Sequence, residues 1–211
     1  DMAVAVSSSN SNAGHLPPDT GTLVIGSRGR WLIDDPGYQQ YLATSERAFT
    51  LGVKAHNAPV INGQSATRKP AQRTFAFSSP ERRVHSVTVD LTESYPRELN
   101  LQSVRRTVWL TGSNLILVAD QITGTGIEQI DYHWHGHPTA AWWVEENVAR
   151  LVFSDTTLWL TSPSATLSAR NLDRLSGSRG QLTLSASAAL NIPTLWWIFS
   201  LDAPPPAVTL S

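Results

Sequence analysis

Short apolar runs separated by turn signals recur about every ten residues, and this rhythm constrains the fold more than any other feature. The clearest runs are residues 22–25, 86–91, 104–110, 115–120, 148–153, 157–161, 181–186 and 194–201. Clusters of Gly, Ser, Asn, Asp and Pro lie between them. The pattern predicts an all-β chain: an antiparallel two-sheet β-sandwich of about a dozen strands, with Trp109 between the sheets.

One segment departs from the strand pattern. Residues 37–48 and the adjacent Phe49 place aromatic and apolar side chains at helix-like offsets, which predicts one short helix or an ordered loop. The Ser/Asn-rich beginning and the proline-rich end predict irregular termini. We therefore expect a linker over residues 1–13, the sandwich domain over 14–201 and a tail over 202–211.

Composition removes several classes of function. Sixteen Lys and Arg against seventeen Asp and Glu give a net charge of -1, which does not favour a nucleic-acid partner. The absence of cysteine excludes disulfides and thiol catalysis. No apolar run approaches the roughly 20 residues of a membrane helix, so no membrane partner is expected. Common hydrolase, kinase, dehydrogenase and zinc-protease motifs are absent from the sequence.

Histidines alternate with other residues in the segment 132–138. If this segment is a strand, His133, His135 and His137 share one face and either bind a metal or line a polar groove. The alternative is a bend at Gly136 and Pro138, with the histidines hydrogen-bonded separately.

A second polar set lies in the first third of the chain. Its members are His15, Asp19, Asp34, Asp35, His56 and Asn57. Imidazole and carboxylate groups suit zinc or general-base chemistry. From spacing alone, the structural alternative, in which these residues form turns and caps, is favoured.

Two Trp-Trp pairs, 142–143 and 196–197, add aromatic surface. Indole rings can stack on sugar rings, but neighbouring side chains in a strand point to opposite faces. We expect one core Trp and one surface or interface Trp in each pair.

The order of these motifs resembles a known family. The motifs are Gly14-His15-Leu16-Pro17-Pro18-Asp19, Gly29-Arg30-Trp31-Leu32-Ile33-Asp34-Asp35-Pro36-Gly37 and His56-Asn57-Ala58-Pro59-Val60-Ile61-Asn62-Gly63. They are followed by Thr92-Glu93-Ser94-Tyr95-Pro96 and the histidine-rich strand. Over residues 10–200 the chain resembles the C-terminal β-sandwich of the heparinase II/III-like polysaccharide lyases.

The resemblance implies roles for particular residues. His15 matches a histidine that faces the substrate cleft and assists catalysis, whereas Asp35 and His56 match two ligands of a structural zinc. Pro17 stands where that family has the third ligand, and proline has no side-chain donor atom, so the zinc site lacks a ligand.

Four further residues are expected to bind substrate. Arg47 would hold a substrate carboxylate, although a structural salt bridge is an equal alternative. The others are Asn57, His133 and His135.

The family's lyases also carry an N-terminal helical toroid, and nothing before His15 matches it. The resemblance therefore implies the sandwich part of a lyase that cleaves acidic, uronic-acid-containing polysaccharide by β-elimination. On this reading the isolated chain is inactive, needs a toroid domain or subunit, and comes from a periplasmic or extracellular bacterial protein. The alternative is a non-catalytic module that binds carbohydrate or packs on a partner domain.

Overall fold

The computed structural model describes residues 1–8, 19–37, 41, 45–67, 69–170, 183–188 and 194–205. This part contains fifteen strands, one α-helix and two 3-10 helices. In chain order these are β1 (Met2–Val6), β2 (Leu23–Ser27), β3 (Arg30–Ile33), α1 (Ser45–Thr50), β4 (Val60–Ile61), β5 (Gln72–Ser79), β6 (Val84–Asp90), η1 (Thr92–Ser94), η2 (Arg97–Leu99), β7 (Leu101–Thr111), β8 (Leu115–Gly124), β9 (Ile130–His135), β10 (Ala141–Glu145), β11 (Val148–Val152), β12 (Thr157–Thr161), β13 (Ala165–Arg170), β14 (Thr183–Ala188) and β15 (Thr194–Leu201). The predicted all-β class, with one short α-helix, is confirmed.

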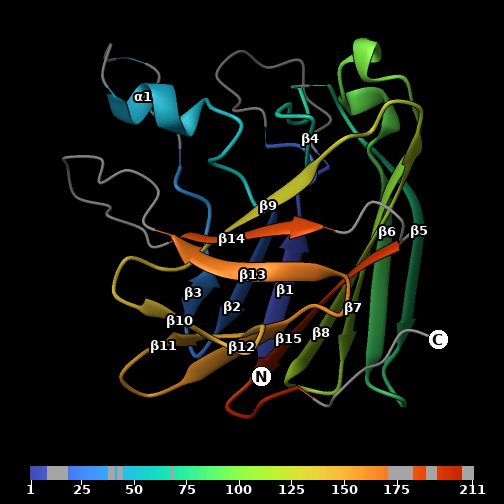
Figure 1. The fold of residues 1–211 in the computed structure, drawn as a ribbon. Helices are drawn as coiled ribbons and strands as arrows, with labels where there is room; N and C mark the ends of the chain where they lie inside the picture. Colours follow the sequence, from blue (N-terminus) through green and yellow to red (C-terminus); the bar gives the residue numbers. More distant parts are fainter. Residues whose placement is uncertain are drawn as a thin grey trace.

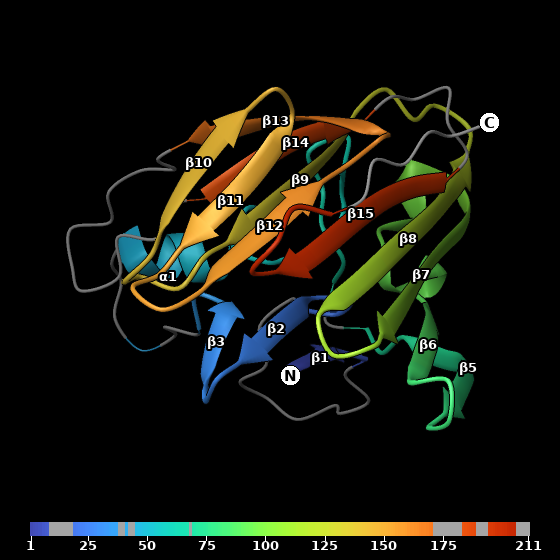
Figure 2. The ribbon, with the colours of Figure 1, turned by 90° about the horizontal axis from the view of Figure 1, so that it is seen from below.

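The strands form three antiparallel sheets (Figure 1). The large sheet has eight strands in the order β10-β11-β12-β15-β8-β7-β6-β5. Two smaller sheets, β1-β2-β3 and β13-β14-β9-β4, lie against it (Figure 2). The second layer of the predicted two-sheet sandwich is thus divided into two sheets.

The two smaller sheets meet where β3 and β9 end. Ile33 and Gly136 form an isolated antiparallel bridge. The Asp34 amide donates to the His135 carbonyl at 2.9 Å, and the His137 amide donates to the Leu32 carbonyl at 3.1 Å. The bend predicted at Gly136 is therefore the junction between the sheets, and β9 ends at His135.

Aromatic side chains fill the space between the layers. Trp134 on β9 lies with its ring centroid 5.3 Å from that of Trp197 and 5.1 Å from that of Phe199, both on β15. All three are buried. Burial of rings of this size supplies much of the hydrophobic stabilisation between the layers.

Trp109 does not take part in that core, so its predicted position was wrong. Alternation along β7 turns Val108 inward, and Trp109 points to the outer face of the large sheet. There it stacks on Trp196 with ring centroids 5.8 Å apart. In the pair 142–143, Trp142 is 5% exposed and Trp143 is 58% exposed, as expected from strand alternation.

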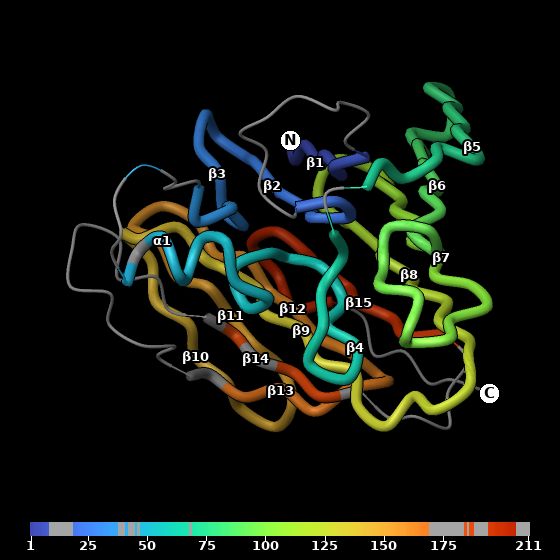
Figure 3. The backbone as a smooth tube through the Cα atoms, turned by 90° about the horizontal axis from the view of Figure 1, so that it is seen from above, coloured from blue at the N-terminus to red at the C-terminus, as the bar shows by residue number. Residues whose placement is uncertain are grey.

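Two predicted segments, 1–13 and 37–48, differ from the observed elements. Residues 1–13, expected as a linker, include β1, which pairs with β2. The helix α1 overlaps only the end of the segment 37–48. Figure 3 shows the chain from α1 to β4 crossing one end of the molecule, close to β9.

Candidate functional site

Asp35 and His56 form a pair at the end of the molecule that carries α1, in which the histidine is buried and the aspartate is partly exposed. His56 Nδ1 lies 2.9 Å from Asp35 Oδ2, and His56 is only 1% exposed. The other carboxylate oxygen, Asp35 Oδ1, accepts from the Gly37 amide at 2.9 Å. Gly37 has a positive φ of 88°, which glycine adopts without strain. The Asp-Pro-Gly turn therefore orients the carboxylate that holds His56.

The second nitrogen of this histidine is not used within the described part of the chain. His56 Nε2 is buried and has no hydrogen-bond partner among the described residues. A carboxylate on one imidazole nitrogen fixes the ring and its tautomer, which prepares the other nitrogen to accept or donate a proton.

Asn57 is the hydrogen-bonding centre of the same region. Its Nδ2 donates to the Leu23 carbonyl at 2.9 Å and to the Asp34 carbonyl at 2.8 Å. Its Oδ1 accepts from the His135 amide at 2.8 Å. The side chain is completely buried. Asn57 thus ties β2, the Asp-Pro-Gly turn and the end of β9 together.

His135 joins the cluster from β9. Its Nε2 lies 2.8 Å from the Lys54 carbonyl, and its ring meets Phe49 of α1 edge-on with centroids 5.9 Å apart. Burial lowers the pKa of His135 to about 3, while the Lys54 carbonyl opposes and His133 adds to this shift. His135 is therefore neutral at ordinary pH. His133, two residues earlier on the same strand, is also buried.

Asp19 lies next to the Asp35–His56 pair. Burial raises its pKa, the electrostatic interaction with His56 lowers it, and the negative charge of Asp35 raises the pKa further. Asp19 follows His15 by four residues in the chain.

Arg106 on β7 holds the cluster in place through hydrogen bonds, and this role was not predicted from the sequence. Its guanidinium makes a bidentate contact with Asp120, with Nε–Oδ1 at 2.7 Å and Nη2–Oδ2 at 2.8 Å. Nη1 donates to the carbonyls of Gly21 and Asn57 at 2.6 and 2.7 Å. Burial opposes the charge of Arg106, but Asp120 outweighs it and raises the arginine pKa. The sequence feature that could have revealed this role is a charged residue at an inward-facing position on each of two paired apolar strands, Arg106 on β7 and Asp120 on β8.

Not all of the remaining predicted residues lie in the described part of the chain. His15 and Pro17 lie outside the described residues. Arg47 is half-buried on α1, two residues from the Phe49 that packs on His135. His137 stands apart from the cluster and is hydrogen-bonded through Nδ1 to Thr139 Oγ1 at 2.9 Å. The three alternating histidines therefore do not converge.

A structural zinc needs more ligands than the Asp35–His56 pair supplies. Structural zinc sites take four ligands, and these two side chains are in direct hydrogen-bond contact. Within the described ranges, no three His, Cys, Asp or Glu side chains are grouped to hold a metal ion. The described residues do not fit zinc by themselves, and a structural zinc stays a prediction.

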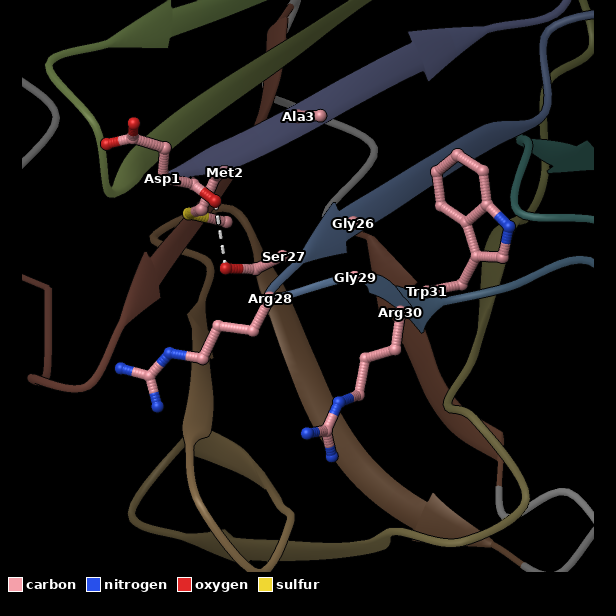
Figure 4. Close-up of a pocket in the computed structure, with 9 residues that line it drawn as sticks. All are labelled: Asp1, Met2, Ala3, Gly26, Ser27, Arg28, Gly29, Arg30 and Trp31. Carbon is pink, nitrogen blue, oxygen red and sulfur yellow. Dashed lines mark hydrogen bonds between the residues drawn. The ribbon is translucent and has the colours of Figure 1, made fainter.

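A separate hollow lies at the β2–β3 hairpin (Figure 4). Its side chains include Arg28, Arg30 and the half-exposed Trp31. Both guanidinium groups are engaged, Arg28 with Asp202 at 2.5 Å and Arg30 with Asp155 at 2.6 Å. The cations of this hollow are neutralised within the domain, so the cluster around His56 is the stronger candidate site.

The sequence matches the family model described as "Heparinase II/III-like, C-terminal" over residues 1–210. The chain belongs to this family. The predicted resemblance is therefore confirmed, and it extends beyond residues 10–200 at both ends. No protein of curated function matches the chain.

Solved structures show the same fold as this heparinase II/III-like domain. The heparan sulfate lyase HepC from Pedobacter heparinus is similar with a TM-score of 0.77 at 16% identity, over 98% of this chain and 34% of HepC. The BT4657 gene product, a heparinase III, gives 0.76 at 14% identity over 94% of this chain and 32% of its own. A further heparinase III gives 0.73 at 16% identity over 95% and 33%. This domain spans about a third of the length of each of these chains.

No helix within the described ranges is long and apolar enough to cross a membrane.

Proposed function

We propose that this domain is the sandwich part of a polysaccharide lyase that cleaves uronic-acid-containing polysaccharide by β-elimination. The observation that carries the proposal is the convergence of Asp35, His56, Asn57 and His135 in a member of the heparinase II/III-like family. These residues come from three motifs of the sequence resemblance that span about a hundred residues, and the fold joins them into one hydrogen-bonded cluster.

The chemistry requires three groups around the sugar. A base removes the proton α to the C6 carboxylate, and the released electron pair forms the C4–C5 double bond. The bond from C4 to the glycosidic oxygen breaks, and an acid protonates that oxygen. A cation or amide stabilises the enolate-like intermediate. We assign His15 to the proton-transfer set and Arg47 to the substrate carboxylate.

The buried residues have a different role in this proposal. Asn57 and His135 are completely buried and their polar atoms are bonded within the domain. They are therefore positioning residues, which hold the turn and the strand end beneath the substrate. Asp35 acts in the same way by fixing the His56 ring.

The lyase needs a second domain in this account. A helical toroid outside these residues would complete the cleft and provide the rest of the proton-transfer groups. Related solved chains are about three times as long as this domain, which leaves room for such a part. Because polysaccharides of this kind are extracellular polymers, we place the enzyme in the periplasm or outside the cell.

The test measures unsaturated uronate ends by their ultraviolet absorbance. The domain would be incubated alone, and then together with the helical region encoded beside it, with alginate, heparan sulfate, chondroitin and hyaluronan. We expect product only from the combination, and none from the combination with His15→Ala. Product from the domain alone would contradict the need for a toroid. No product from either would reject the lyase proposal and favour a binding module.

A further inference from the structure

Two tryptophans and an arginine form a row on the outer face of the large sheet. Trp143 on β10 pairs with Arg150 on β11, and Arg150 pairs with Trp159 on β12. The three strands lie side by side at one edge of the sheet (Figure 2). Since neighbouring strands are about 4.8 Å apart, the two tryptophan backbones are separated by about 10 Å.

The row borders a groove. Its principal side chains are Trp143, Glu145, Glu146, Arg150, Trp159 and Pro204. Trp143 is 58% exposed, the largest exposed fraction of any tryptophan among the described residues. An indole so exposed, next to a hollow, gains from contact with a ligand that has an apolar face.

Arg150 is held ready for an anionic group. Its guanidinium carbon lies 6.0 Å from the centre of the Trp159 ring, which orients the cation by a cation–π contact. No described residue accepts a hydrogen bond from it or forms an ion pair with it. Arg28, Arg30, Arg105 and Arg106 all have carboxylate partners, so Arg150 differs from them.

The groove is separate from the cluster around His56. Trp142, the neighbour of Trp143, points inward, and its indole Nε1 lies close to Gly136 at the end of β9. A Cβ on Gly136 would approach Trp142 Nε1 to 3.0 Å. Strand alternation therefore sends one tryptophan toward the cluster and the next to the opposite face of the sheet.

We propose that this Trp–Arg–Trp groove is a second carbohydrate-binding site, which holds a uronic-acid-containing chain of low charge density outside the cleavage site. The indoles stack on the C–H faces of the sugar rings, and Arg150 binds a carboxylate. Glu145 and Glu146 accept hydrogen bonds from hydroxyl groups and repel densely sulfated chains, because the two carboxylates exceed the one guanidinium. The ligand class, although not the site, rests on the proposed function.

Binding of hyaluronan oligosaccharides to the whole chain tests this inference. We expect Trp143→Ala to weaken binding at least about tenfold, the order of magnitude of a lost ring stack on other aromatic platforms. Arg150→Gln should weaken hyaluronan binding while leaving the far weaker binding of a neutral cello-oligosaccharide unchanged. Trp31→Ala, which removes another exposed tryptophan away from the groove, is the matched control and should bind as the unmodified chain does.

Three results would overturn the inference: no hyaluronan binding, equal loss in Trp31→Ala and Trp143→Ala, or binding of heparin or the neutral oligosaccharide as tight as that of hyaluronan. Circular dichroism spectra of the variants would show that the exposed positions leave the fold intact. The readout is binding, not cleavage. Groove binding by this chain, together with no elimination product from the domain combined with its helical region, would therefore reject the lyase proposal and leave the second site standing. Product from the combination without groove binding would reject the second site and leave the lyase proposal standing.

Discussion

The His56 cluster and the Trp–Arg–Trp groove use polar groups in contrasting ways. In the cluster His56, Asn57 and His135 are buried, and most of the polar groups are hydrogen-bonded to another strand or turn. In the groove Trp143 and Arg150 are exposed, and the cation is oriented only by a ring. A group that is bonded within the fold can fix geometry, whereas an exposed group is available to a ligand. The cluster should therefore control stability and catalysis, and the groove only binding.

Breaking the Arg106–Asp120 pair should have the largest effect. Arg106→Met leaves a buried Asp120 carboxylate without its partner and removes two donors from the cluster, so we expect a loss of about 3–5 kcal/mol in unfolding free energy. Arg105→Ala is the matched control: its exposed pair with Asp90 should contribute only about 0.2–1 kcal/mol. Urea unfolding measures both. A similar loss in the two variants would contradict the description of Arg106 as an anchor.

Removal of the Asn57 amide should come next. Asn57→Ala orphans the buried Leu23 and Asp34 carbonyls and the His135 amide, and each unsatisfied group costs about 1–3 kcal/mol. We expect a loss of about 3 kcal/mol by chemical denaturation, the lower end of the sum over these three groups. If stability were unchanged, Asn57 would not connect β2, the turn and β9.

The pH dependence of stability should report His135. Its folded pKa of about 3 lies below the ordinary histidine value of 6.5. The unfolded chain therefore binds this proton more readily, and the fold loses stability as the pH falls through 6.5 toward 3. The slope from this group approaches about 1.4 kcal/mol per pH unit in that window.

His135→Gln retains a donor for the Lys54 carbonyl but does not titrate. The difference in unfolding free energy between this variant and the unmodified chain should grow in favour of the variant as the pH falls from 6.5. A pH-independent difference would show that His135 is not buried in its neutral form.

The smallest change in unfolding free energy is expected for Trp143, and its neighbour Trp142 serves as the comparison. Trp143→Ala should change unfolding free energy by no more than about 0.5 kcal/mol, because its side chain is mostly exposed. Trp142→Ala creates a cavity in the core and should cost about 3–5 kcal/mol. Thermal unfolding of the two variants measures this difference. Equal losses of stability would mean that Trp143 also packs in the core.

Strand rhythm predicted the fold class because alternating burial is a local property of the chain. It correctly predicted one inward and one outward tryptophan in the pair 142–143. Alternation alone does not state which alternate set is buried, and for β7 the assignment of Trp109 was one residue out of phase. The division of the second layer into two sheets depends on the bridge between Ile33 and Gly136, which joins segments a hundred residues apart and leaves no local signal.

The candidate site was predictable only in part. The order of the motifs grouped Asp35, His56 and Asn57 in one predicted polar set, and the structure places them together. Their bonds to buried carbonyls, and the support from Arg106, depend on three-dimensional packing. The groove residues Arg150 and Trp159 belong to different strands, and only the register of β10, β11 and β12 aligns them with Trp143.

The most direct measurement is the rate of elimination by the domain assembled with its helical region, before and after Asp35→Ala. If the cluster positions the catalytic groups, the substitution should lower kcat by up to about 100-fold with a much smaller change in KM. Asp35→Asn, which can still accept a hydrogen bond from His56, should recover part of the rate. An unchanged kcat in Asp35→Ala would contradict the account, because the Asp35–His56 pair would then have no part in the chemistry.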